Sequence, residues 1–431
     1  MKHIYLSLML VLAVLYVSAQ KIDRIITVKK VSKIEKTLSA DDMEGRATFT
    51  PGIDKAADFI AAAFKKNKLL PAEGSNGYFQ EFALVEATQT AVSGNADGNA
   101  INESNMVVLT TKETLTVNEQ SGYETGTIDA NDRLFNKAYG YINSGKNYIV
   151  WVDTAHSKSF GNLLRFKRES FKSDGSILFV LTGKAPATYS FSAQHTISEK
   201  KLKNVVGMLP GKSQSDRKDE YVIFSAHYDH LGIGQADNKG DSIFNGANDD
   251  AAGTTAVMML SSYFSKIKNN ERTIVFAAFT AEEIGGFGSQ YFSKQFNPEK
   301  VVAMFNIEMI GTDSKWGKNS AYITGYEKTD MGEILAKNLQ GTAFTFYPDP
   351  YPDQQLFYRS DNATLARLGV PAHTISTSKM DNEPYYHTQG DEIETLDLKN
   401  MTEIIKAIAL SSASIVNGTD SPSRVDTTQL R

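Results

Sequence analysis

One imidazole and three carboxylates come at or just after the ends of short apolar runs in this sequence. They are His227 after residues 221–226, Glu282 and Glu283 after residues 272–279, and Glu308 after residues 301–306. If the fold brings these groups together, the carboxylates repel one another unless a divalent cation neutralises them. The residue types therefore indicate a metal site.

The apolar runs have the composition of buried parallel strands. Each is six to eight residues long and rich in β-branched and aromatic side chains, and a helical pattern through Ser265 separates the first two. We therefore expect an α/β fold with a largely parallel sheet. Such sheets bind ligands beyond the carboxyl ends of their strands, which is where the acidic residues fall.

The same residues lie within motifs that resemble peptidase family M28, the zinc-dependent aminopeptidases. In chain order the motifs are His227-x-Asp229, Gly246-Ala-Asn-Asp249, Glu282-Glu283 followed by Gly285, Asn306-x-Glu308-Met-Ile-Gly311, and Tyr386-His387 with Asp391. The resemblance covers residues 38–80 and 203–416. It implies a mixed, largely parallel sheet flanked by helices, as in other zinc exopeptidases.

The resemblance also implies two zinc ions that share one bridging carboxylate, Asp249. His227 and Glu308 would complete the protein ligands of one ion, and Glu283 and His387 would complete those of the other. Nitrogen and oxygen donors suit zinc, and they also suit cobalt or manganese.

Four further residues have roles that the resemblance implies. Glu282 would be the general base that takes a proton from the attacking water and returns it to the leaving amine. Tyr386 would polarise the carbonyl oxygen of the substrate. Asp229 and Asp391 would accept the second N–H of a ligand imidazole.

The chain departs from the family pattern at two positions. Glu308 stands where most members have aspartate, and its extra methylene bears on the affinity of the second metal. The change also bears on substrate specificity, because this ligand lies beside the free amine of the substrate in aminopeptidases. Asn362 stands where a histidine is common. His230 and Asp250 are interpreted as bystanders, although Asp250 can favour the start of the following helix.

The function that the resemblance implies is an aminopeptidase that acts on peptides. A metallo-carboxypeptidase or dipeptidase on the same fold is the first alternative. A glutaminyl cyclase and an inactive binding module are two others, which the intact Glu282-Glu283 pair and the complete ligand set disfavour. The aromatic stretch 341–357 is either an ordinary surface loop or a pocket wall that would favour apolar side chains.

The first nineteen residues are typical of a signal peptide. Lys2 and His3 precede an apolar run over residues 4–17, and small residues end this segment at Ala19. The run, about fourteen residues long, is too short to span a bilayer comfortably. We therefore expect export to the periplasm or the medium, and a mature chain without stable membrane insertion.

Composition excludes several further classes of function. A formal net charge of -5 gives no basic footprint for nucleic acid. The chain has no cysteine, which excludes disulfides, thiolate ligands and a lipid-modified cysteine. Peptides remain the expected partners.

Changes in composition along the sequence indicate the domain organisation. The signal peptide covers residues 1–19, an M28-like α/β domain covers residues 20–84 and 201–431, and an inserted module covers residues 85–200. The insertion is polar with scattered strand-like runs, so we expect a mainly β module, either similar to a protease-associated insertion or a lid. The polar tail from Gly418 is expected to fray.

Overall fold

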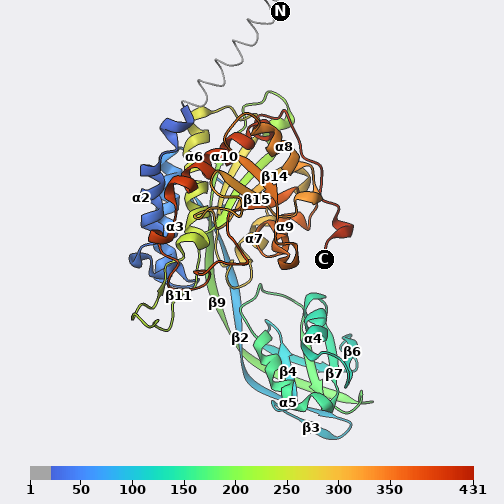
Figure 1. Ribbon diagram of the computed structural model, residues 1–431. Helices are drawn as coiled ribbons and strands as arrows, with labels where there is room; N and C mark the ends of the chain where they lie inside the picture. The colour runs from blue at the N-terminus through green and yellow to red at the C-terminus, as the bar shows by residue number, and fades with distance from the viewer. Residues whose placement is uncertain (1–20) are drawn as a thin grey trace, which may run out of the picture. The chain divides into compact units, whose positions relative to one another are not determined.

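The computed structural model describes residues 21–431, so the predicted signal peptide lies outside the described residues. The chain divides into two compact units (Figure 1). The main unit consists of the chain up to Glu81 together with Leu202–Arg431, and the inserted unit is Phe82–Lys201. Within residues 21–431, no helix combines the length and the apolar composition that crossing a bilayer requires.

A mixed, largely parallel sheet runs through the main unit, with strand order β16-β15-β17-β14-β10-β13-β9. Its strands are β9 (Tyr189–Leu209), β10 (Tyr221–His227), β13 (Thr273–Phe279), β14 (Val301–Ile307), β15 (Ser320–Ile323), β16 (Thr345–Pro348) and β17 (Ala372–Ser376). Strands β13, β10, β14 and β17 are mutually parallel, whereas β9 and β15 are antiparallel to their neighbours in this group. The predicted fold class is confirmed, and the three predicted apolar runs are the central strands β10, β13 and β14.

The register of these strands brings the candidate site residues to one edge of the sheet. His227 pairs with Phe279 in β13, and Ser225 pairs with Asn306 in β14. Glu282 and Glu308 therefore follow the ends of their strands at the same edge as His227.

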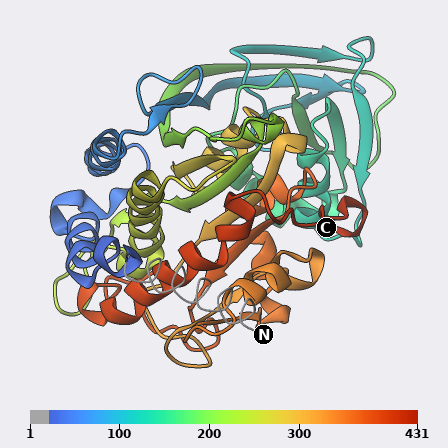
Figure 2. The same ribbon diagram turned by 90° about the horizontal axis from the view of Figure 1, so that it is seen from above.

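Helices cover both faces of the main sheet (Figures 1 and 2). The helices on one face are α2 (Val28–Leu38), α3 (Pro51–Lys66), α6 (Ala252–Ile267), α8 (Met331–Asn338) and α10 (Leu398–Ser411). The helices on the other face are α7 (Phe287–Ser293) and α9 (Asn362–Ala366). The yellow-green α6 and the red α10 run side by side in Figure 2. Because side chains alternate along a strand, each central strand contributes to both cores.

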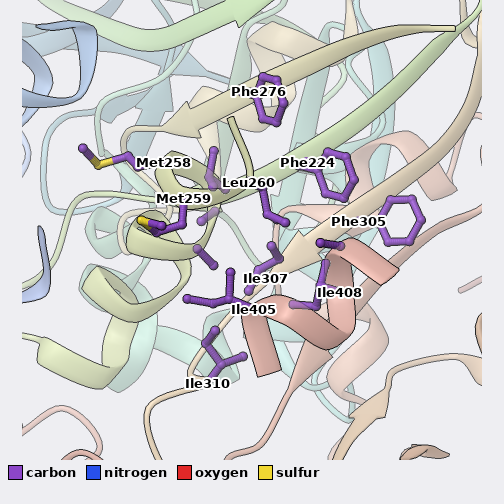
Figure 3. Close-up of a cluster of buried hydrophobic side chains, with 14 of the residues drawn as sticks. Phe224, Met258, Met259, Leu260, Phe276, Phe305, Ile307, Ile310, Ile405 and Ile408 are labelled. Atoms are coloured by element: carbon purple, nitrogen blue, oxygen red, sulfur yellow. The ribbon is translucent and has the colours of Figure 1, made fainter. Parts of the chain in front are cut away.

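The larger core is centred on Phe224 in β10. Its ring lies 4.9 Å from that of Phe305 and 5.9 Å from that of Phe276, so the three central strands are joined by aromatic packing. Figure 3 shows these rings beside the aliphatic side chains of α6 and α10. Helix α6 lies close to β14, because a Cβ at Gly253 would come within 2.1 Å of the backbone oxygen of Ile307.

The inserted unit combines a four-stranded sheet with helices. The sheet has the order β4-β8-β7-β6, from β4 (Met106–Leu109), β6 (Glu124–Ile128), β7 (Tyr148–Val152) and β8 (Ile177–Leu181). Helix α4 (Leu134–Asn143) connects the parallel strands β6 and β7, and with α5 (Ser157–Phe160) it covers one face. The other face packs on β3 (Asn99–Ile101), β5 (Thr114–Asn118) and parts of β2 (Phe79–Ala96) and β9. Strands make up most of the regular structure in this unit, and α4 and α5 add two short helices.

The tail after Gly418 is ordered against the main unit, so the prediction that it frays was wrong. Arg424 Nη1 donates to the backbone oxygen of Val301 at 2.8 Å, and the side chain of Val425 is buried. These two contacts fix a segment whose composition is otherwise polar.

Replacing Phe224 with alanine should destabilise the main unit by about 3–5 kcal/mol, because the cavity would lie between three strands and α6. Guanidinium unfolding, followed by the fluorescence of Trp316 in a Trp151→Phe background, measures this change. The matched control is Phe135→Ala in the inserted unit, where the ring is exposed. A Phe224 variant that unfolds at the same denaturant concentration as this control would contradict the assigned core.

Candidate metal centre

Asp249 lies between two groups of ligand-type side chains. Its Oδ1 is 3.2 Å from His227 Nε2, and its Oδ2 is 3.2 Å from His387 Nε2. Donor atoms of His227, Asp249 and Glu308 all lie within 4.8 Å of one another. On the other side, His387 Nε2 is 3.3 Å from Glu283 Oε2. A carboxylate that directs one oxygen to each group has the geometry of a bridging ligand.

Two buried atoms of this cluster support the presence of a cation. His227 Nε2 and Glu308 Oε2 have no hydrogen-bond partner within the described part of the chain. His227 Nδ1 donates to the backbone oxygen of Asp229 at 3.1 Å, which leaves the lone pair of Nε2 directed at the cluster. Unpaired buried polar atoms are costly, and imidazole with carboxylate is a donor set that zinc accepts. The residues therefore fit a metal ion.

Charge in the cluster leads to the same conclusion. Burial lowers the pKa of His227, but the Asp249 carboxylate and its acidic neighbours raise the pKa well above its ordinary value. Hydrogen bonds to Asp249 and Glu283 raise the pKa of His387 to about 10. The carboxylates thus favour the positively charged forms of both imidazoles, and a site that favours positive charge suits a cation.

The loops that carry the ligands turn sharply beside them. Ala281, Met309 and His387 have positive φ values of 60°, 52° and 55°. This left-handed conformation is uncommon for residues other than glycine. It reverses the chain just before Glu282 and just after Glu308, so both side chains remain at the sheet edge.

Asp229 positions the two adjacent glutamates. Its Oδ1 accepts the backbone N–H of Glu282 at 3.1 Å, and its Oδ2 accepts that of Glu283 at 3.2 Å. The imidazole of His227 donates to the backbone oxygen of Asp229, and the nearer carboxylate oxygen is 3.7 Å away. The residue thus orients the imidazole through its backbone, and its carboxylate holds the Glu282-Glu283 loop.

Asp391 has a different contact from the one that we expect from the sequence. Its Oδ1 accepts the backbone N–H of Asn248 at 2.8 Å, and its Oδ2 accepts that of Asp249 at 3.0 Å. The carboxylate therefore fixes the backbone of the bridging residue rather than a ligand imidazole.

His230 and Asp250 are not bystanders. His230 is buried, and its Nδ1 donates to Glu283 Oε1 at 2.7 Å. Asp250 Oδ1 accepts the backbone N–H groups of Gly253 and Met309, both at 3.0 Å. Asp250 thus links the start of α6 to the residue after Glu308. The one sequence signal for His230 is a second histidine three residues after His227.

Arg46 is a site residue that the sequence does not reveal, because the segment 44–46 reads only as packing and a turn. Its buried guanidinium donates to the backbone oxygens of Tyr228 at 2.9 Å, Asn245 at 2.6 Å and Gly246 at 2.9 Å. One side chain therefore joins the loop after β10 to the loop that carries Asp249. Gly246 has φ 54° and lies so close to His230 that a Cβ would come within 2.5 Å of the ring.

Glu282 and Tyr386 have protonation properties that suit the roles expected of them. Burial, reinforced by the carboxylates of Glu308, Asp361 and Glu283, raises the pKa of Glu282 well above its ordinary value, although His227 opposes this. A raised pKa makes the carboxylate a better proton acceptor. Burial also raises the pKa of Tyr386, so its phenol stays protonated, and its ring stacks on that of His387 at 4.0 Å.

A small cavity of about 40 Å³ opens beside Glu308 and Tyr386. Of the aromatic stretch 341–357, only Leu356 lines this cavity. Tyr351 and Phe357 are buried in the interior, and Tyr347 stacks on Trp316 at 4.2 Å. The stretch is therefore packed down rather than a wall of the cavity.

Residues 204–412 match the model of Peptidase family M28. The domain formed by these residues belongs to peptidase family M28. The predicted resemblance is confirmed, and the matched residues include all nine candidate residues of the site, from His227 to Asp391.

Curated relatives of this M28 domain are aminopeptidases and metalloproteases by name. A "Probable leucine aminopeptidase" of Trichophyton verrucosum is 30% identical over 212 residues, which are 47% of this chain and 54% of the relative. A "Probable zinc metalloprotease" of Pyrenophora teres f. teres is 33% identical over 252 residues, 52% of this chain and 50% of the relative. The chain thus spans about half the length of the curated relatives that it matches.

Solved structures share the fold of the chain. The aminopeptidase from Aneurinibacillus sp. strain AM-1 superposes with a TM-score of 0.54 at 16% identity, over 92% of this chain and 95% of that one. The zinc aminopeptidase BSAP from Bacillus subtilis gives 0.53 at 16% identity, over 93% and 98%.

Removing the hydrogen bond of His230 should weaken metal binding at the Glu283 side. We expect His230→Leu to lower the Zn²⁺ affinity of one site by roughly 10- to 100-fold, as is usual for partners of metal ligands. His230→Gln keeps an N–H donor and should lose less. Titration against a chelating indicator measures both variants, with His156→Leu in the inserted unit as the control. Equal affinities for His230→Leu and the control would contradict this role.

Proposed function

We propose that the protein is a zinc-dependent aminopeptidase that removes N-terminal residues from peptides. The observation that supports this most strongly is the placement of Asp249, with one oxygen 3.2 Å from an imidazole of each ligand group. The relatives named as leucine aminopeptidases support the same reaction class.

The proposed ligands form two sets around Asp249. His227 and Glu308 would hold one zinc ion together with Asp249 Oδ1, and Glu283 and His387 would hold the other with Asp249 Oδ2. When bound, zinc lowers the pKa of water and polarises a carbonyl group. His230 would keep Glu283 in a single orientation through the hydrogen bond that it donates.

The residues of this chain would then carry the proton transfers. Glu282, whose basicity burial increases, would accept a proton from the attacking water and deliver it to the leaving amine. Asp229 holds Glu282 by its backbone, so the carboxylate can act without moving the neighbouring ligand Glu283. Tyr386 would donate its phenolic proton in a hydrogen bond to the developing oxyanion.

The cavity beside Glu308 favours an exopeptidase. It is a small recess lined by Glu308 and Tyr386, and Thr374 and Ser376 of the sheet line its interior. A terminal residue can end there, with its ammonium group beside the Glu308 carboxylate.

We further propose that residues 1–19 direct export. A chain without cysteine, whose proposed catalysis needs no thiol, is consistent with this.

Free and N-acetylated versions of one peptide library should behave differently with this enzyme. We expect trimming of the free peptides only, because acetylation removes the charge that Glu308 would recognise, and we expect a chelator to stop it. Mass spectrometry of the products measures both effects. Glu282→Gln should lose activity by at least 1,000-fold, in the range of lost acid–base groups, yet bind as much zinc as the wild type.

Two outcomes would contradict the proposed function. Cleavage of acetylated peptides at the same rate would instead favour a carboxypeptidase or dipeptidase. A Glu282→Gln variant with full activity would exclude Glu282 as the base.

A further inference from the structure

One residue that lines the cavity beside Glu308 is an arginine without a carboxylate partner. Arg359 lines the cavity and is largely exposed. Its Nη1 lies 3.4 Å from Gln354 Oε1, and Arg359 forms no ion pair with another side chain of residues 21–431. A cation at the wall of a recognition pocket can bind an anionic group of the substrate.

Two hydroxyl groups that line the cavity, those of Tyr322 and Thr374, are already engaged with the protein. Tyr322 Oη donates to the backbone oxygen of Ser378 at 3.1 Å, and Thr374 Oγ1 donates to Asn362 Oδ1 at 2.9 Å. Their protons are therefore committed away from the cavity. Arg359 is left as the charged donor among the residues that line it.

The position of the cavity relative to Glu308 decides which part of a peptide would enter it. In the proposed reaction the α-ammonium group lies beside the Glu308 carboxylate. The side chain of the same residue branches one bond away from that nitrogen, so it falls into the recess that Glu308 and Tyr386 share with Arg359. A volume of about 40 Å³ suits a short side chain better than a large aromatic one.

We propose that Arg359 makes this enzyme select peptides with an acidic N-terminal residue, aspartate in particular and glutamate next. This inference rests on the proposed aminopeptidase function. The side-chain carboxylate would accept hydrogen bonds from the guanidinium, while the ammonium group pairs with Glu308. The two opposite charges of one small residue would then match the opposite charges of two residues that line the cavity, Glu308 and Arg359.

Aminoacyl p-nitroanilides of aspartate, glutamate, alanine and leucine test this selectivity with the zinc-loaded protein. We expect kcat/KM for the aspartyl substrate to exceed those for alanine and leucine. Arg359→Gln should lower the aspartyl value by roughly 10- to 100-fold, the range for a hydrogen bond to a charged group, and leave the alanyl value unchanged. Arg359→Lys should retain part of the preference.

The matched control is Arg367→Gln, which removes an exposed charge eight positions away that does not line the cavity. This variant should keep the wild-type selectivity. Faster hydrolysis of the leucyl than of the aspartyl substrate, or an equal loss on aspartate and alanine in Arg359→Gln, would overturn the role of Arg359 alone. No hydrolysis of any of the four substrates would overturn the proposed function as well.

Discussion

The structure depends on how several buried carboxylates coexist at one edge of a sheet. The acidic side chains gathered there are the buried Asp249, Asp250 and Asp361 and the half-buried Glu282, Glu283 and Glu308. Burial raises the pKa of Asp250 and of Asp361, and neither oxygen of Asp361 has a hydrogen-bond partner in the described chain. Two imidazoles beside Asp249 offset part of this charge. In the proposed enzyme, divalent cations would offset the rest.

A network of side chain to backbone hydrogen bonds keeps this edge in place without using the ligand atoms. Arg46 joins the loop after β10 to the loop that carries the bridging aspartate, and Asp391 holds the backbone at Asp249 itself. Asp229 and Asp250 hold the loops of the glutamates in the same way. Because the supports bind backbone groups, the ligand side chains remain free to meet an ion, which is the preorganisation that metal catalysis requires.

The central part of the fold follows from the sequence. Runs such as residues 221–226 are almost entirely apolar, which is the composition of strands that are buried on both faces. Placing these groups at the ends of the strands then predicts where His227, Glu283 and Glu308 meet. The order of the motifs indicates Asp249 and His387, which follow none of these strands.

Other features depend on contacts that local pattern does not encode. Arg46 binds the backbone near residue 228, a separation of 182 positions, and no spacing rule connects the two. Met309 has a positive φ, which a glycine at this position would have predicted and a methionine does not. Helix α4 follows a polar stretch and buries only Leu134 and Ala138, too few residues to reveal a helical period in the sequence. The aromatic stretch was ambiguous for a similar reason, since rings look alike in a sequence whether they pack inward or line a pocket.

The proposed function requires Asp249 to bridge two metal ions. Crystals of the zinc-loaded protein, measured above and below the zinc absorption edge, test it directly. We expect two anomalous peaks about 3.5–4 Å apart on either side of Asp249. One should lie beside His227 and Glu308, and the other beside Glu283 and His387. A single peak in fully loaded protein, or two peaks that do not share Asp249, would contradict it.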